Sequence, residues 1–165
     1  NFLHAAARAL LTRNDLRFIC IGEDGRVPRT HLVALAQELG IDSRVRWIGH
    51  YDNIPAAMAA LDILTSTSAY GEGFPNVVGE AMAVGTAVVV TNVGDSARIA
   101  GELGVVVSPG NPEALAQGWF DVLEGNNFHE GAFQRRQRIV EHFSDTRMIE
   151  TMADLYLAIG SNTGV

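Results

Sequence analysis

Short apolar runs rich in β-branched residues alternate along this chain with longer amphipathic stretches. Such runs are typical of strands buried on both faces of a parallel sheet, and the stretches between them are long enough for crossover helices. The predicted strands span Arg17–Ile21, Val45–Ile48, Ile63–Thr65, Ala87–Thr91 and Val105–Val107. The predicted helices span 1–13, 29–39, 54–60, 76–84, 96–100 and 112–124, and two closing helices follow at about 128–159. The pattern predicts an α/β fold with a doubly wound parallel sheet.

The length of 165 residues fits one domain with a core of its own. A doubly wound sheet normally begins on a strand, whereas this sequence opens on a predicted helix. We therefore expect that a first strand precedes Asn1 and that the chain is N-terminally truncated. The predicted domain covers 1–159, and 160–165 are expected to form a flexible tail.

The charged residues exclude several classes of function. Acidic residues outnumber basic ones by 19 to 12, giving a formal net charge of −7, so we expect no nucleic-acid partner. Every basic residue is an arginine, and the lack of lysine removes P-loop, Schiff-base and Ser-Lys chemistry, which all need an amine. The histidines are scattered and no Asp-x-Asp pair is present, so we expect no metal site.

Two further features bear on the compartment. The single cysteine, Cys20, excludes an internal disulfide, and its apolar neighbours predict a buried thiol. No apolar run approaches the ~20 residues that span a bilayer. We expect a cytoplasmic protein, with any membrane contact limited to peripheral binding of the full-length protein at the inner membrane face.

The segment after the third predicted strand carries the most chemical information. A glycine-rich loop holding Glu72 runs into a helix with Pro75 at its first position and free N–H groups at Asn76, Val77 and Val78, which predicts an anion site suited to a diphosphate. Glu80 follows among apolar residues, where a buried acid needs donors, and two vicinal ribose hydroxyls would supply them. An alternative interpretation fits the spacing equally well. In it, Glu72 is a solvated loop acid and Glu80 is an acid of the N-terminal turn that the helix dipole favours.

The string EGFPNVVGEAMAVGTAVVVTNVGDSARIA, residues 72–100, resembles the nucleotide-sugar-binding signature of the retaining glycosyltransferases of family 4, whose fold is GT-B. Glu72 and Glu80 match that family's E-x7-E pair. The segments 17–25, 105–116 and 142–156 also resemble the C-terminal half of the family. The chain is thereby identified as a Rossmann-like, donor-binding domain of a two-domain enzyme.

The resemblance implies a donor site for a UDP-, GDP- or ADP-sugar, with no cofactor or metal, and an acceptor held by a separate N-terminal domain. Glu72 would contact the transferred sugar, as the catalytic residue, and Glu80 would hold the ribose. Further donor contacts are implied for the backbone of Gly73, Phe74, Asn76 and Val77, for Gly22 beside the phosphates, and for Arg46 and Trp47 beside the base. The implied reaction is a retaining, hexosyl-type transfer in polysaccharide or glycolipid biosynthesis.

The sequence departs from the family pattern in three places. Pro75 stands where glycine is common, and Gly94-Asp95 replaces a common Gly-Gly. The arginine and lysine that neutralise the leaving diphosphate in the family lie upstream of this chain, so the fragment alone is expected to be inactive.

Other interpretations stay open at this stage. A surface charge and a core aromatic also account for Arg46 and Trp47, and a solvated face accounts for the arginines at 135, 136 and 138. A non-catalytic nucleotide-binding or interaction module of the same fold is the alternative function, and it would not need Glu72. A phosphoacceptor signalling domain is disfavoured because it needs a lysine.

Overall fold

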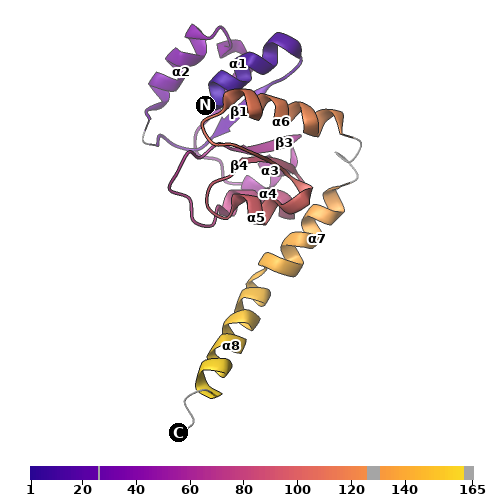
Figure 1. Cartoon of the computed structure of the whole chain (residues 1–165). Helices are drawn as coiled ribbons and strands as arrows, with labels where there is room; N and C mark the ends of the chain where they lie inside the picture. The colour runs from indigo at the N-terminus through magenta and orange to yellow at the C-terminus, as the bar shows by residue number, and fades with distance from the viewer. Residues whose placement is uncertain (26, 126–130, 162–165) are drawn as a thin grey trace.

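The computed structural model describes residues 1–25, 27–125 and 131–161 and has the predicted α/β architecture (Figure 1). Its strands are β1 (Phe18–Ile21), β2 (Val45–Ile48), β3 (Ile63–Ser66), β4 (Ala87–Thr91) and β5 (Val105–Val107). Its helices are α1 (Phe2–Thr12), α2 (Arg29–Glu38), α3 (Ile54–Ala59), α4 (Asn76–Ala83), α5 (Ser96–Ala100), α6 (Pro112–Glu124), α7 (Ala132–Phe143) and α8 (Asp145–Ser161). Two short 3₁₀ turns, Asp42–Arg44 and Gly101–Leu103, precede β2 and β5. Each predicted element is present. Two segments lie outside the described residues: 126–130, where the closing helices were expected to begin, and 162–165, which is most of the predicted tail.

Local sequence signals set several helix starts. Asn53 and Asn111 cap α3 and α6, accepting hydrogen bonds from Ala56 N at 3.2 Å and Ala114 N at 3.0 Å. A proline follows each cap at the first helical position, where its fixed φ favours the helix and its missing N–H removes no hydrogen bond. The predicted start of α6 at Asn111-Pro112 is therefore confirmed.

All strand pairs are parallel, but the strands form two hydrogen-bonded ladders, one of β2 and β1 and the other of β3, β4 and β5. Within the described residues no backbone hydrogen bond joins β1 to β3, so each has one unpaired edge. On one side of the gap the strands follow in the order β1, β2, and on the other side in the order β3, β4, β5. The gap is thus the topological switch point of a doubly wound sheet.

Helices cover both faces of the sheet, and β4 divides the core between them. Val89 faces a cluster with α1, α6 and the first two strands, whereas Val88 and Val90 face a cluster with α4 and α5. All five β4 residues are buried, which explains their uniformly β-branched or small composition. Burying each valine contributes roughly 1.5–3 kcal/mol.

Aromatic rings connect the two ladders on the α1 and α6 side. The ring centroids of Phe2, Phe18 and Trp119 lie 5.3–5.7 Å apart, and the Trp119 Nε1–H donates to Thr65 Oγ1 at 3.0 Å. Because Phe18 lies in β1 and Thr65 in β3, this cluster spans the gap from one face.

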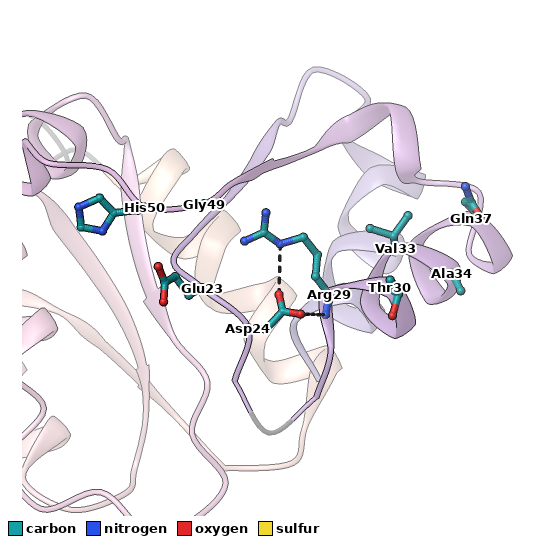
Figure 2. Close-up of a pocket in the computed structure, with 9 residues that line it drawn as sticks. All are labelled: Glu23, Asp24, Arg29, Thr30, Val33, Ala34, Gln37, Gly49 and His50. Atoms are coloured by element: carbon teal, nitrogen blue, oxygen red, sulfur yellow. Dashed lines mark hydrogen bonds and ion pairs between the residues drawn. The ribbon is translucent and has the colours of Figure 1, made fainter.

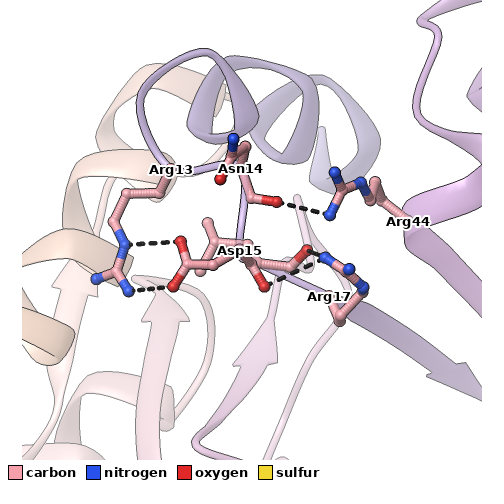
Figure 3. Close-up of polar contacts among 6 residues, drawn as sticks. Arg13, Asn14, Asp15, Arg17 and Arg44 are labelled. Atoms are coloured by element: carbon pink, nitrogen blue, oxygen red, sulfur yellow. Dashed lines mark hydrogen bonds and ion pairs between the residues drawn. The ribbon is translucent and has the colours of Figure 1, made fainter.

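The turn from α1 to β1 is held by arginines (Figure 3). The Arg13 guanidinium forms two hydrogen bonds with the Asp15 carboxylate, at 3.1 and 2.6 Å, and holds the pKa of Asp15 below its ordinary value. Arg17 donates to the carbonyl of Leu16 at 2.9 Å, and Arg44 reaches across to that of Asn14 at 2.6 Å. The last contact ties the entry of β1 to the entry of β2.

The prediction of a solvated face for the arginine cluster on α7 is wrong for Arg135, which is buried, and for the half-buried Arg138, whereas Arg136 is exposed. Arg135 is buried, its pKa is lowered by desolvation, and its Nε donates to the Gly85 carbonyl at 2.9 Å. Arg136 donates to the Ala83 carbonyl at 2.9 Å, and Arg138 donates to the carbonyls of Ile99 and Arg98 at 2.9 and 2.6 Å. These carbonyls lie at the C-terminal ends of α4 and α5, where cations are favoured by the helix dipole.

Beyond α7, helix α8 extends away from the sheet (Figure 1). Several of its apolar side chains are exposed, among them Met148, Ile149, Met152 and Tyr156.

The unpaired edges of β1 and β3 predict an uneven pattern of amide hydrogen exchange. In NMR-detected exchange, we expect the alternate amides of β1 and β3 that face the gap to exchange at least about tenfold faster than the amides of β4. Equal protection of all three strands would show that the gap is closed in solution.

Candidate functional site

The loop from β3 to α4 begins with two hydroxyl contacts at the carboxyl ends of the strands. The buried Thr91 hydroxyl, at the end of β4, donates to the Ser68 carbonyl at 2.7 Å and lies 3.4 Å from that of Ser66. The Ser68 hydroxyl donates to Glu72 Oε1 at 2.6 Å. Glu72 is half-buried, so it is not the fully solvated loop acid of the alternative interpretation.

The loop from β4 to α5 lies directly against Glu72 and Gly73. Gly94 has a φ of +56°, and a Cβ at this position would lie 2.5 Å from the Glu72 carbonyl oxygen and still closer to that of Gly73. The Asp95 N–H donates to the Gly73 carbonyl at 2.9 Å. Only glycine fits at position 94, whereas Asp95 uses its backbone, so its side chain is free to bind Arg98 at 3.1 Å.

The start of α4 differs from the prediction in one respect. Pro75 is the N-cap residue rather than the first helical residue, and its carbonyl accepts from the Val78 N–H at 3.0 Å. The N–H of Val78 is therefore not free as predicted. Asn76 and Val77 are exposed and begin the helix, so their N–H groups have no intrahelical acceptor.

Glu80 is exposed, and the argument that its burial demands donors is wrong. The apolar residues around it in sequence, including Val78 and Met82, turn to the opposite, buried side of α4. Glu80 shares the exposed face with Asn76 and Val77, four and three residues earlier. The exposed side of α4 thus carries the Glu80 carboxylate, and its start carries two N–H groups without an intrahelical acceptor, next to the exposed Gly73 and Phe74.

Gly22, at the end of β1, has a φ of +132° and no atom within 4 Å of where a Cβ would lie. Its N–H is occupied by the carbonyls of Ile48 and Gly49, and its carbonyl accepts from Arg29 at 2.6 Å. The Arg29 Nε also lies 3.6 Å from Asp24 Oδ1. Arg29 was not identified from the sequence. Its position in the first turn of a helix that follows a glycine-rich strand end was the signal that could have pointed to it.

Two pockets lie near the end of β1, and Figure 2 shows the residues that line the first of them. One, of about 680 Å³, is lined by Glu23, Asp24, Arg29, Thr30, Val33, Ala34, Gln37, Gly49 and His50. A second, of about 100 Å³, includes Gly22 and Trp47 in its lining. Glu72 and Glu80 line neither pocket.

Arg46 and Trp47 point to opposite faces of β2. Arg46 is exposed, and Trp47 is half-buried against the core, as the alternative interpretation of these residues expected. Only Trp47 lies beside Gly22, in the smaller pocket.

Desolvation raises the pKa of the half-buried Cys20 thiol, which keeps it protonated and poorly nucleophilic near neutral pH. In residues 1–25, 27–125 and 131–161, no three His, Cys, Asp or Glu side chains gather into a metal-binding group. None of the helices in these ranges is both long and apolar enough to cross a membrane.

Comparison with known proteins supplies the family. Residues 1–124 match the family model described as "Glycosyl transferases group 1". A D-inositol 3-phosphate glycosyltransferase from Salinispora tropica is 34% identical over 131 residues, covering 77% of this chain and 27% of that protein. The chain thus spans about a quarter of the length of this relative.

Two solved structures share the fold. The C-terminal domain of a glycosyl transferase group 1 family protein from Francisella tularensis aligns with a TM-score of 0.75 and 26% identity, over 87% of this chain and 78% of that chain. Anabaena HepE in complex with UDP and glucose aligns with a TM-score of 0.77 and 25% identity, over 94% of this chain and 44% of that chain.

The close approach of Gly94 to the neighbouring loop predicts a large effect of one methyl group. Gly94→Ala should lower the free energy of unfolding by about 3 kcal/mol or more, since the Cβ meets backbone that cannot move aside. Gly110→Ala is the matched control, because Gly110 also has positive φ but open space around it, and its cost should be about 1 kcal/mol. Equal losses in urea denaturation would contradict the steric account.

Proposed function

This chain belongs to the glycosyl transferases group 1 family, and we propose that it is the donor-binding, C-terminal domain of a retaining, family 4 enzyme with two domains. The observation that carries this proposal is the surface formed by Glu72, Glu80 and the start of α4. In doubly wound sheets ligands bind outside the carboxyl ends of the strands at the switch point, and the ends of β1 and β3 flank it here. We propose that this donor-binding domain comprises residues 1–159.

The start of α4 suits the diphosphate of a nucleotide sugar. Asn76 and Val77 are exposed residues whose N–H groups have no intrahelical acceptor, and the helix dipole adds positive potential there. The backbone of Gly73 and Phe74 continues this surface toward the sugar. The open space at Gly22 leaves room for a phosphate to approach the end of β1, although its own N–H is occupied.

The two glutamates take separate roles. Glu80 is accessible and acceptor-only when ionised, so one carboxylate can receive both ribose hydroxyls. Glu72 lies at the loop, nearer the end of β3, where it contacts the transferred sugar. Trp47 and the backbone of Arg46 border the base, which is that of a UDP-, GDP- or ADP-sugar.

The remainder of the catalytic machinery is proposed to lie in the longer protein. We propose that a strand of the longer protein pairs with the unpaired edges of β1 and β3, and that an N-terminal domain holds the acceptor. We propose a cytoplasmic enzyme, peripheral at the inner membrane face if associated at all, that transfers a hexosyl group to a polysaccharide or glycolipid without metal or cofactor. The leaving diphosphate is stabilised by the start of α4 and by an arginine and a lysine that lie upstream of the first helix of this same domain.

HepE binds UDP and glucose, and its match to this chain supports a nucleotide-sugar ligand. The name of the Salinispora relative, D-inositol 3-phosphate glycosyltransferase, supports a glycosyl transfer reaction. A non-catalytic nucleotide-binding module would retain dependence on Glu80 and lose dependence on Glu72.

Calorimetric titration with UDP, GDP and ADP tests the donor site. We expect one of the three to bind and Glu80→Gln to weaken its affinity by about tenfold, because a charged acceptor for the ribose is lost. Glu113→Gln is the control, since Glu113 is also an exposed acid near a helix start. Binding of none of the three, or equal affinities of the wild-type chain and Glu80→Gln, would overturn the proposal.

A further inference from the structure

We propose that Ser68 is a positioning residue that aims the Glu72 carboxylate at the sugar of the donor. The inference rests on the proposed function and deepens it, since it names the group that selects the sugar over the bare nucleotide. The Ser68 hydroxyl lies 2.6 Å from Glu72 Oε1 and is the only side chain found to bind this carboxylate among the described residues.

The loop around Glu72 leaves the carboxylate in need of an anchor. Gly71, with a φ of +80°, and Gly73 flank it, and neither has a side chain to pack against. A glutamate side chain in such a loop would sample several rotamers. The bond from Ser68 selects one of them and leaves the second oxygen, Oε2, free to accept from a sugar hydroxyl.

Ser68 is itself held in place from the core. Its carbonyl accepts the hydrogen bond from the Thr91 hydroxyl at 2.7 Å, and Thr91 ends the fully buried strand β4. The hydroxyl of Ser68 therefore projects from a fixed backbone, and a short, charge-assisted bond to a carboxylate is the strong kind.

The backbone of Glu72 is held independently of Ser68. Gly94 packs against its carbonyl, and the Asp95 N–H binds the carbonyl of the next residue at 2.9 Å. Removing the Ser68 hydroxyl therefore frees the carboxylate while the loop stays in place. Nucleotide binding, which uses Glu80 and the start of α4, should be unaffected.

The test compares affinities for UDP, GDP and ADP with those for UDP-glucose, GDP-glucose and ADP-glucose, using calorimetry on the whole chain. For the base that binds, Ser68→Ala should lower the affinity for the sugar nucleotide by roughly tenfold and leave that for the nucleotide within about twofold. Ser68→Thr keeps the hydroxyl and should restore sugar-nucleotide affinity. Ser66→Ala removes a hydroxyl two residues earlier that makes no side-chain hydrogen bond within the described structure, and it should match the wild-type chain.

A second measurement is independent of any ligand. NMR couplings of the Glu72 side chain should show a single rotamer in the wild-type chain and Ser68→Thr, and averaging in Ser68→Ala. If no sugar nucleotide binds the wild-type chain, the proposed function fails, while the couplings still decide whether Ser68 fixes the carboxylate. An unchanged rotamer in Ser68→Ala, or equal losses of nucleotide and sugar nucleotide, would overturn the positioning role.

Discussion

The contact between the β4–α5 loop and the β3–α4 loop fixes the candidate site. Because Gly94 has no side chain, its backbone can approach the carbonyls of Glu72 and Gly73, and Asp95 adds a hydrogen bond. The two loops follow neighbouring parallel strands, whose carboxyl ends meet at one edge of the sheet. A glycine-rich loop that would otherwise sample many conformations is thereby held in one.

The C-terminal helices extend this control to the far ends of α4 and α5. The arginines of α7 satisfy the terminal carbonyls of both helices, and Gly101 leaves the space that the Arg138 guanidinium fills. At the other end of α7, the Phe143 ring lies 5.8 Å from the Phe74 ring and within 6 Å of the guanidinium groups of Arg98 and Arg138. Helix α7 thus contacts the site loop directly, although 69 residues separate the two rings in sequence.

Periodicity and capping signals predicted the fold well, since every strand and helix arises from local patterns such as the β-branched run of β4 and the Asn111-Pro112 start of α6. Long-range contacts were beyond these signals. A run of arginines is polar in any sequence, and only the fold shows that Arg135 meets the end of another helix. Glu80 was expected to be buried because its neighbours along the chain are apolar. In the helix, however, those neighbours turn to the buried side and Glu80 turns to the surface.

Mapping of backbone amide shifts on addition of the nucleotide that binds tests the central claim most directly. A donor site at the switch point predicts the largest shifts at Gly73, Asn76 and Val77, with smaller shifts at Gly22. Shifts confined to the pocket lined by Val33 and Gln37 would place the nucleotide outside this surface and contradict the account.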